Sequence, residues 1–139
     1  MLETAASFLA KMDSIGWKYR DTHVLENGNI NIDTSFNGKQ TTINFSIFFD
    51  TDGYSATVRA VRLFPAPIDK KLQLLEDINN CNKQYRWVKY YIDDEGDVNL
   101  QIDALINEET SGEIIVELIR KAVSIIDETY PTFMRTIWA

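Results

Sequence analysis

Apolar residues recur at two different spacings along this chain, and the change in spacing separates helices from strands. The first helix is predicted over Leu2–Ser14, where apolar positions follow helical spacing. Its apolar stripe consists of Ala5, Phe8, Leu9 and Met12. Gly16 follows as a candidate C-terminal cap, because glycine readily adopts the left-handed conformation that ends many helices.

Four strands are predicted next, over Trp17–Leu25, Asn29–Phe36, Thr41–Phe49 and Tyr54–Phe64. In the third, Ile43, Phe45, Ile47 and Phe49 alternate with polar residues, the pattern of a strand half-buried in an antiparallel sheet. Asn-Gly and Asp-Gly pairs separate the strands and favour tight hairpins, since their backbones tolerate positive φ. The fourth strand changes its apolar face after Ala60, from Ala56 and Val58 to Val61 and Leu63, which predicts a β-bulge near Ala60.

A second helix is predicted over Ile68–Asn80, after the break at Pro65-Ala66-Pro67. Its predicted inward face is Ile68, Leu72, Leu75 and Ile78, flanked by Leu74 and Cys81. Asn79 falls on the same face, where a polar side chain needs a partner. We therefore expect Asn79 or Asn82 to bond backbone groups at the helix exit and to direct the following hairpin. The arms of that hairpin are Tyr85–Asp93 and Asp97–Asp103.

The last helix has the widest apolar surface. Thr110-Ser111-Gly112-Glu113 has the spacing of a capping box, so we expect the helix to begin there. Its apolar residues between Ile114 and Ile126 fill an arc of about 200°, wider than the usual core-facing stripe of about 100°. Either the helix is embedded against the sheet and another helix, or part of it meets a partner. Pro131 is expected to break or kink it, leaving a short apolar end through Trp138.

The order of these elements predicts an α+β fold: an antiparallel sheet with helices packed on it, in the order α-β-β-β-β-α-β-β-α. The 139 residues fit a single domain over 1–139. A net charge of −7 disfavours nucleic-acid binding. No signal-peptide pattern or membrane-length apolar run is present, and the one cysteine excludes an intrachain disulfide. We expect a cytoplasmic protein that binds no nucleic acid and no membrane.

The helix end and hairpin carry a family resemblance. The residues concerned are Ile78-Asn79, Asn82, Arg86, Lys89, the run Tyr91–Val98, Leu100 and Asp103. This segment resembles the YbjN-like family of bacterial sensory transduction regulators, and the element order agrees across nearly the whole chain. The resemblance implies a fold similar to type III secretion chaperones, with a twisted antiparallel sheet flanked by helices and often a homodimer. It implies no enzyme activity and no catalytic residues.

Few residues suggest chemistry. The acidic turns Asp93–Asp97 and Asp50–Gly53 could hold calcium, but neither has the ligand spacing of an EF-hand, and acidic residues are normal in turns. His23 and Cys81 are the only histidine and cysteine, too few for a transition-metal cluster, and nothing in the pattern brings them together. We predict no catalytic, cofactor-binding or metal-binding residue, and a protein that is not an enzyme.

The fifth strand supplies the candidate surface. Alternation would place Tyr85, Trp87, Lys89 and Tyr91 on one face. Arg86, Val88, Tyr90 and Ile92 would form the other. Both faces carry large apolar groups, so one is expected to pack under helices and the other to meet a second subunit, a helix or a bound segment. Interleaved basic and aromatic residues also occur in nucleic-acid platforms, but the acidic balance favours a protein interface.

The functional prediction is a non-enzymatic protein-binding module, chaperone-like or regulatory, that acts as a homodimer and binds a protein partner the sequence does not specify. The alternative is a small-molecule-sensing regulatory domain with a ligand held between sheet and helices. A closed apolar cavity with a few convergent polar groups would favour the alternative. An enzyme would require a cluster of titratable groups in a cleft.

Overall fold

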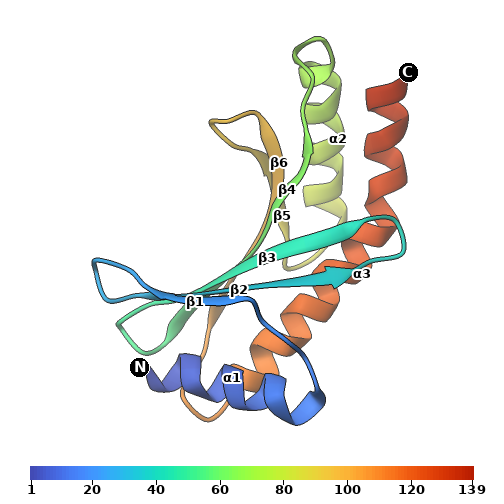
Figure 1. Ribbon diagram of the computed structural model, residues 1–139. Coiled ribbons are helices and arrows are strands. Elements are labelled where there is room, and N and C mark those ends of the chain that lie inside the picture. Colours follow the sequence, from blue (N-terminus) through green and yellow to red (C-terminus); the bar gives the residue numbers. More distant parts are fainter.

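A six-stranded antiparallel sheet and three helices make up the computed structural model, which describes residues 1–139 (Figure 1). The elements are α1 (Glu3–Ile15), β1 (Asp21–Val24), β2 (Ile30–Asn37), β3 (Thr42–Phe49), β4 (Ser55–Pro65), α2 (Lys71–Gln84), β5 (Lys89–Ile92), β6 (Asp97–Leu105) and α3 (Ser111–Trp138). A 3₁₀ turn, η1 (Ile68–Lys70), leads into α2. The predicted α+β class and element order are confirmed.

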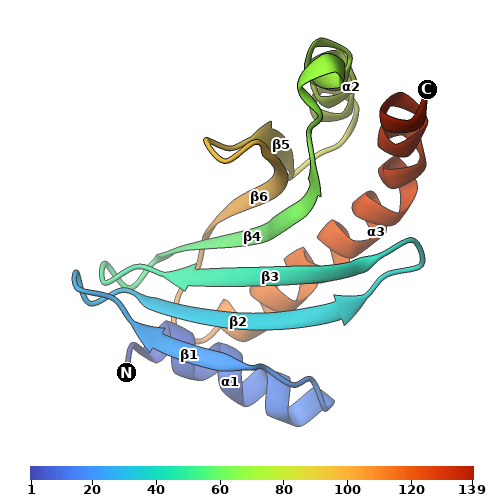
Figure 2. The ribbon, with the colours of Figure 1, turned by 45° about the horizontal axis from the view of Figure 1, so that its top comes forward.

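The strands lie in the order β1-β2-β3-β4-β6-β5, so the hairpin of β5 and β6 completes the sheet through pairing of β6 with β4. Helices α1 and α3 pack on one face of the sheet, and α2 lies beside β5 and α3 (Figure 1, Figure 2). The opposite face carries no helix. The core forms between the sheet and the helices as one cluster of 30 buried residues.

Strands β2 and β3 follow the predicted alternation. Ile43, Phe45, Ile47 and Phe49 of β3 are all fully buried against the helices, while the residues between them face the other side. Phe8 of α1 packs against Phe49, with ring centroids 5.7 Å apart. A side-chain period of two therefore identified the buried face correctly, because each strand is covered on one side only.

The first strand is shorter than predicted and begins at Asp21 rather than Trp17. Gly16 has φ 77° and caps α1 as expected, and the N–H of Trp17 donates to the carbonyl of Met12. This cap turns the chain back over the end of α1. The Trp17 ring then packs edge-on against Phe36 of β2, with centroids 4.6 Å apart, instead of entering the sheet.

The predicted bulge in β4 is present. Pairing with β6 shifts register between Ala60 and Phe64, and Arg62 adopts a left-handed φ of 49°. The N–H of Arg62 donates to Oδ1 of Asn99 at 2.7 Å, which satisfies the backbone group that the bulge removes from the ladder. The residue that returns to the core is Phe64, whereas Val61 and Leu63 are only half-buried.

Of the predicted inward face of α2 only Ile78 is buried, and the helix is rotated toward the flanking residues Leu74 and Cys81. Its buried residues are Leu74, Ile78 and Cys81, while Ile68 and Leu72 are 94% and 83% exposed. Asn79 is also exposed, so the prediction that it lies on the inward face is wrong. Rotation of a helix is decided by the surface on which it packs, and α2 contacts both β5 and α3.

Helix α3 begins where predicted, with Thr110 at the N-cap position, but it is capped differently and extends further than predicted. Thr110 makes no side-chain cap, and Oδ1 of Asn107 instead accepts the N–H groups of Glu109 and Thr110, each at 2.9 Å. The helix is also not broken at Pro131 but runs on to Trp138, changing direction along its length (Figure 1). Proline removes one helical hydrogen bond. Burial of Phe133 beyond it offsets that loss.

The wide apolar arc of α3 is covered within the chain. Its central residues are buried against the sheet and α1, and the border positions Ile114 and Val123 are half-buried. Of the two explanations for the arc, embedding against the sheet and another helix is correct. The arc therefore supplies no evidence for a partner.

Gly112 allows α1 and α3 to approach closely. A Cβ at this position would lie 2.8 Å from the carbonyl oxygen of Ser7 and 2.8 Å from Cβ of Lys11. We expect Gly112→Ala to lower the free energy of unfolding by about 2 kcal/mol, since the backbone of α1 must move, despite the better helix propensity of alanine. Urea unfolding followed by circular dichroism measures the change. The control, Ser124→Ala on the exposed side of α3, should stay within about 0.5 kcal/mol; equal midpoints for both variants would contradict the close-packing argument.

Candidate functional site

The four residues predicted to share a strand face are placed in two different settings. Tyr85 caps the C-terminal end of α2 and is half-buried, and Trp87 lies in the following connection with φ 77°. Only Lys89 and Tyr91 belong to β5. The predicted common face is therefore wrong for Tyr85 and Trp87, because the left-handed backbone at Trp87 interrupts the extended geometry on which alternation depends.

Asn82 fixes the start of the hairpin. Its Oδ1 accepts the N–H of Tyr90 at 2.8 Å, and its Nδ2 donates to the carbonyl of Tyr90 at 3.1 Å. β5 is an edge strand, so this side chain stands in for a neighbouring strand at Tyr90. Of the two asparagines proposed for this role, Asn82 performs it and Asn79 does not. The same contact hinders addition of another strand at this edge.

Tyr90 anchors the inner side of β5. Its hydroxyl lies 2.6 Å from Oγ1 of Thr129, which itself donates to the carbonyl of Ile125, so the tyrosine is the donor between them. Burial raises the pKa of the Tyr90 hydroxyl far above its ordinary value. The ring packs against Phe133 with centroids 5.0 Å apart. This side of the strand is therefore structural and offers no surface to a partner.

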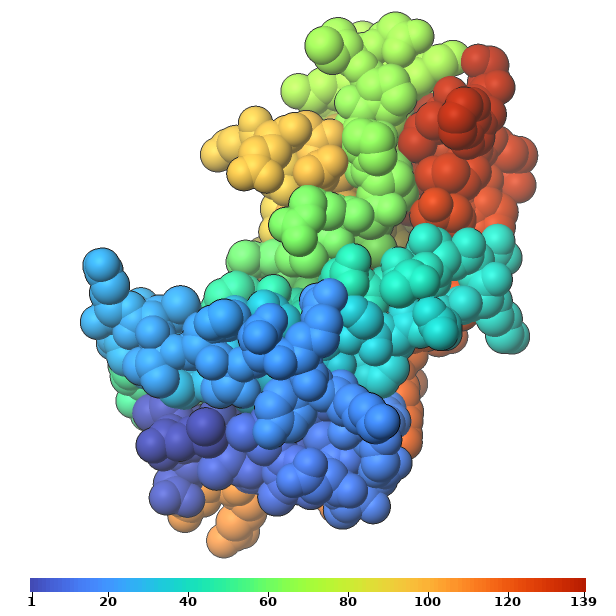
Figure 3. Space-filling model, viewed as in Figure 1, coloured from blue at the N-terminus to red at the C-terminus, as the bar shows by residue number.

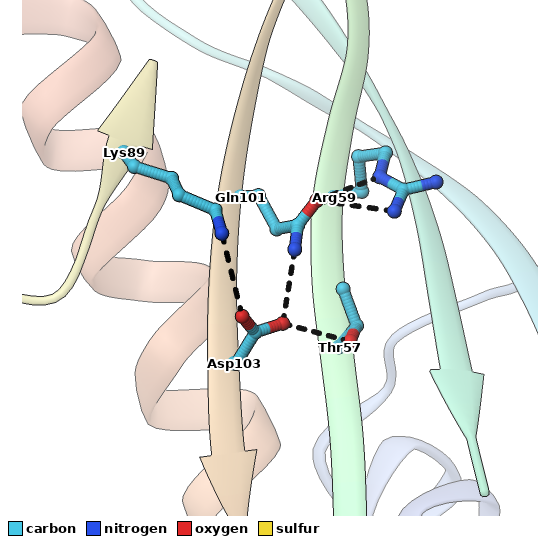
Figure 4. A network of polar contacts seen from close by, with 5 residues as sticks. All are labelled: Thr57, Arg59, Lys89, Gln101 and Asp103. Carbon is cyan, nitrogen blue, oxygen red and sulfur yellow. Dashed lines mark hydrogen bonds and ion pairs between the residues drawn. The ribbon is translucent and has the colours of Figure 1, made fainter. Parts of the chain in front are cut away.

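The helix-free face of the sheet carries a polar network (Figure 4). Asp103 accepts hydrogen bonds from Thr57 at 2.9 Å and Gln101 at 3.0 Å, and its other oxygen lies 3.7 Å from Nζ of Lys89. Gln101 in turn accepts from the guanidinium of Arg59 at 3.0 Å and 3.2 Å. Lys89 and Asp103 are thus paired with each other, whereas the guanidinium of Arg59 bonds a neutral amide and has no acidic partner.

The same face is hollowed. Figure 3 shows the surface recessed between the region of β1 and β2, in blue, and the β5–β6 turn, in yellow. On this face the guanidinium of Arg59 lies over the ring of Phe48, 5.2 Å from its centroid, and both side chains are half-buried. Lys89 and Tyr91 face the same side from β5, next to the network. This placement keeps Lys89 accessible, whereas Tyr91 is half-buried.

The acidic turns are explained by hydrogen bonding. Asp93 accepts the N–H groups of Asp97 at 2.9 Å and Glu95 at 3.0 Å, and these bonds hold the pKa of its carboxyl below the ordinary value. Asp52 does the same for Tyr54 and Ser55, with the same effect on its pKa. Each carboxylate therefore has a structural task in its turn.

His23 and Cys81 lie far apart in the fold. His23 belongs to β1 at one edge of the sheet and pairs with Asp33 at 3.6 Å. Cys81 lies on α2 beside the opposite edge of the sheet. Its burial, and to a smaller extent the negative charge of Asp77, raises the pKa of its thiol. A thiol held in its neutral form is a poor nucleophile. The two residues cannot form a Cys–His pair.

A surface that the sequence did not predict lies on α2. Ile68, Leu72 and Leu75, here called the α2 stripe, are exposed on one side of the η1–α2 segment. Their spacing of four and three residues was visible in the sequence, but it was assigned to the core. Single exposed apolar residues are common, whereas a helical row of them is informative.

A family model described as "Putative bacterial sensory transduction regulator" matches residues 10–135. The chain belongs to the YbjN family. The match runs from α1 into the C-terminal part of α3, so it includes the hairpin whose residues suggested the resemblance. A search of curated proteins found no match. The family description names a regulator rather than an enzyme.

The interior of this YbjN-family chain is occupied by side chains. The main hollows open onto the surface, and the largest, of about 620 Å³, lies along α3 beside Trp17 and Phe36. The alternative function needed a closed cavity between sheet and helices, whereas these hollows, including the one between β2 and α3, are open to solvent. In addition, none of the helices has both the length and the apolar run needed to cross a membrane.

Proposed function

We propose that this YbjN-family chain is a non-enzymatic, protein-binding regulatory module that acts as a homodimer through the α2 stripe. The observation that carries the proposal is the exposure of Ile68 and Leu72, at 94% and 83%. Burying one such side chain contributes about 1.5–3 kcal/mol. A helix that leaves both in water has an unsatisfied apolar face, and association with another protein surface covers it.

A second copy of the chain fits this face. Ile68, Leu72 and Leu75 are separated by four and three residues, the spacing of the seam along which paired helices interdigitate. Asn79 continues the series and is a residue type that sets register when it occurs in such a seam. In a two-fold dimer the α2 stripe of one protomer packs against the α2 stripe of the other, so a single apolar row is enough to form the interface.

The protein partner is proposed to bind next to this interface. Trp87 is 61% exposed and directly follows α2, and Lys89 is exposed on the adjoining strand. Exposed tryptophan is enriched among the residues that dominate protein–protein affinity. Tyr85 and Tyr91, the other two residues predicted for this surface, are half-buried and offer less area to a partner. The net charge of −7 supports a protein rather than a nucleic acid as the partner.

We further propose that the chain works as a single domain in the cytoplasm. One core cluster contains buried residues from every helix and from β2 to β6, which supports a single cooperative unit. The one cysteine is a free thiol, in keeping with a reducing compartment.

Leu72→Gln tests the dimer. The substitution removes an exposed side chain, so the fold of the monomer is expected to stay intact. Loss of about 1 kcal/mol on each protomer weakens the dimer by about 2 kcal/mol, roughly thirtyfold in dissociation constant. Sedimentation equilibrium over a range of concentrations measures this constant, and circular dichroism checks the fold.

Leu105→Gln is the matched control, because Leu105 is 78% exposed at the end of β6 and lies outside the α2 stripe. We expect this variant to dimerise like the wild-type chain. A wild-type chain that remains monomeric at high micromolar concentration would overturn the homodimer. Equal weakening by both substitutions would show that the interface lies elsewhere.

A further inference from the structure

The largest of the main hollows is a groove with an apolar floor and charged walls, in which Asp127 and Glu128 lie beside two cations. It measures about 620 Å³, within the usual size range of small-molecule sites. Phe36 and Val123 contribute to its floor, and Trp17 stands at one end. Lys39 from the β2–β3 turn and Arg120 from α3 line its sides. We call it the Trp17 groove.

The aromatic end of the groove is held in place by packing. The Trp17 ring lies edge-on to Phe36, with centroids 4.6 Å apart and an interplanar angle of 63°. The guanidinium of Arg120 lies over the Trp17 ring, 5.4 Å from its centroid. These contacts orient an aromatic surface and a planar cation beside each other before any ligand binds.

The opposite wall is also fixed. Oδ1 of Asp127 accepts the N–H of Lys39 at 2.8 Å and that of Gln40 at 3.3 Å, which ties the β2–β3 turn to α3. A Cβ at Gly38 would lie 2.7 Å from this oxygen, so glycine is what permits the approach. A groove between two elements joined in this way has little freedom to close or widen.

The two cations of the groove have no acidic partner. The ion pairs of the chain join His23 to Asp33, Lys89 to Asp103 and Lys121 to Glu117. Neither Lys39 nor Arg120 is among them. Asp127 also lines the groove, but its Oδ1 is engaged by two backbone N–H groups, and the second acid, Glu128, is exposed. The groove therefore presents an unpaired lysine and arginine beside an aromatic end, with the exposed carboxylate of Glu128 at the same hollow.

We propose that the Trp17 groove binds a small aromatic carboxylate. The carboxylate is held by Arg120, whose planar guanidinium suits bidentate bonding, with Lys39 supplying a second charge. The ring of the ligand packs against Trp17 and Phe36, where aromatic pairs add to the burial of apolar surface. Such a ligand bridges the loop after α1, the β2–β3 turn and α3. The proposal is independent of the dimer, since neither the α2 stripe nor Trp87 lines this groove.

The test uses 2-naphthoate as the probe and Trp17 as the reporter. Trp87→Phe and Trp138→Phe together remove the other two tryptophans, both exposed, and leave the Trp17 emission alone. We expect saturable quenching of this emission by 2-naphthoate, matched by the heat of binding in calorimetry. The charge-reversed compound 2-naphthylmethylammonium is expected to show no saturation.

Arg120→Gln and Lys121→Gln form the decisive pair. Both residues are exposed cations in adjacent positions of α3, but only Arg120 lines the groove. Arg120→Gln is expected to weaken 2-naphthoate binding by about tenfold or more, since a charge-assisted bond is lost, while Lys121→Gln leaves it unchanged. The proposal is overturned if no saturable binding occurs, if the cationic compound binds equally well, or if the two substitutions have the same effect.

Discussion

Phe133→Ala is expected to lower the free energy of unfolding by about 4 kcal/mol. Phe133 is fully buried, and its ring lies 5.2 Å from that of Phe64 and 5.0 Å from that of Tyr90. It therefore joins α3 to the strand segment after the bulge in β4 and to edge strand β5. Removal leaves a cavity that these separate elements cannot readily fill, and domains of this kind are stable by only about 5–15 kcal/mol in total.

Urea unfolding followed by circular dichroism measures this change, with dilution to the monomer so that dimerisation does not contribute. Tyr54→Ala is the matched control, because Tyr54 is an aromatic residue that is 58% exposed. Its cost is expected to stay near 0.5 kcal/mol. A loss below about 1 kcal/mol for Phe133→Ala would mean that the C-terminal part of α3 does not contribute to the core in solution.

Asn82→Ala is expected to cost about 3 kcal/mol, a large amount for a polar residue on a helix. The substitution removes both bonds to the backbone of Tyr90, whose N–H and carbonyl lose their partner beside a buried side chain. Leaving a buried polar group unsatisfied costs about 1–3 kcal/mol. The gain in helix propensity on replacing asparagine by alanine offsets only about 0.5 kcal/mol of this.

Asn80→Ala isolates the role of these bonds. Asn80 lies on the same helix, is exposed and makes no side-chain hydrogen bond. Asn80→Ala therefore changes helix propensity as Asn82→Ala does, but it keeps the two bonds between Asn82 and Tyr90. We expect this variant to be as stable as the wild-type chain or slightly more stable. Amide hydrogen exchange should show faster exchange in β5 for Asn82→Ala alone; equal exchange in both variants would refute an anchoring role.

The elements predicted best from sequence are those, such as β2 and β3, that are covered by helices on one side only. β2 and β3 pack on one side only, so alternation of apolar and polar residues identifies the buried residues Ile43 to Phe49. The bulge after Ala60 was also predicted correctly, but the change of face to Val61 and Leu63 was not, because the register shift adds two residues to β4 and keeps Phe64 on the face of Ala60. The wide arc of α3 indicated either deep burial or a partner, and the structure shows that the arc is buried within the chain.

The predictions that failed depend on contacts between distant residues. The inward face of α2 is decided by packing on β5 and α3, which selects Leu74, Ile78 and Cys81 over an equally apolar row. Of the break or kink expected at Pro131, the break is absent, because burial of Phe133 holds the helix together past it. In both cases the packing partner lies elsewhere in the chain, so the local pattern of the segment does not reveal it.

The candidate surface shows the same limit. Alternation placed Tyr85, Trp87, Lys89 and Tyr91 on one strand face, but the strand starts only at Lys89. The positive φ of Trp87 and the two bonds from Asn82 determine where β5 begins. Sequence did indicate that an asparagine would direct the hairpin, since a polar residue at a helix exit needs a partner, but geometry selected Asn82 over Asn79.

The sequence by itself determined the order of elements, the antiparallel sheet and the family, because turn residues and apolar spacing act over short distances. Only the tertiary structure decided how the helices dock on the sheet, and with it which apolar row of α2 is buried and which remains in water. The α2 stripe and the Trp17 groove both result from that choice, since each depends on how α2 and α3 dock on the sheet. The free energy of burying a residue is set by the surface it meets, and that surface comes from elsewhere in the chain.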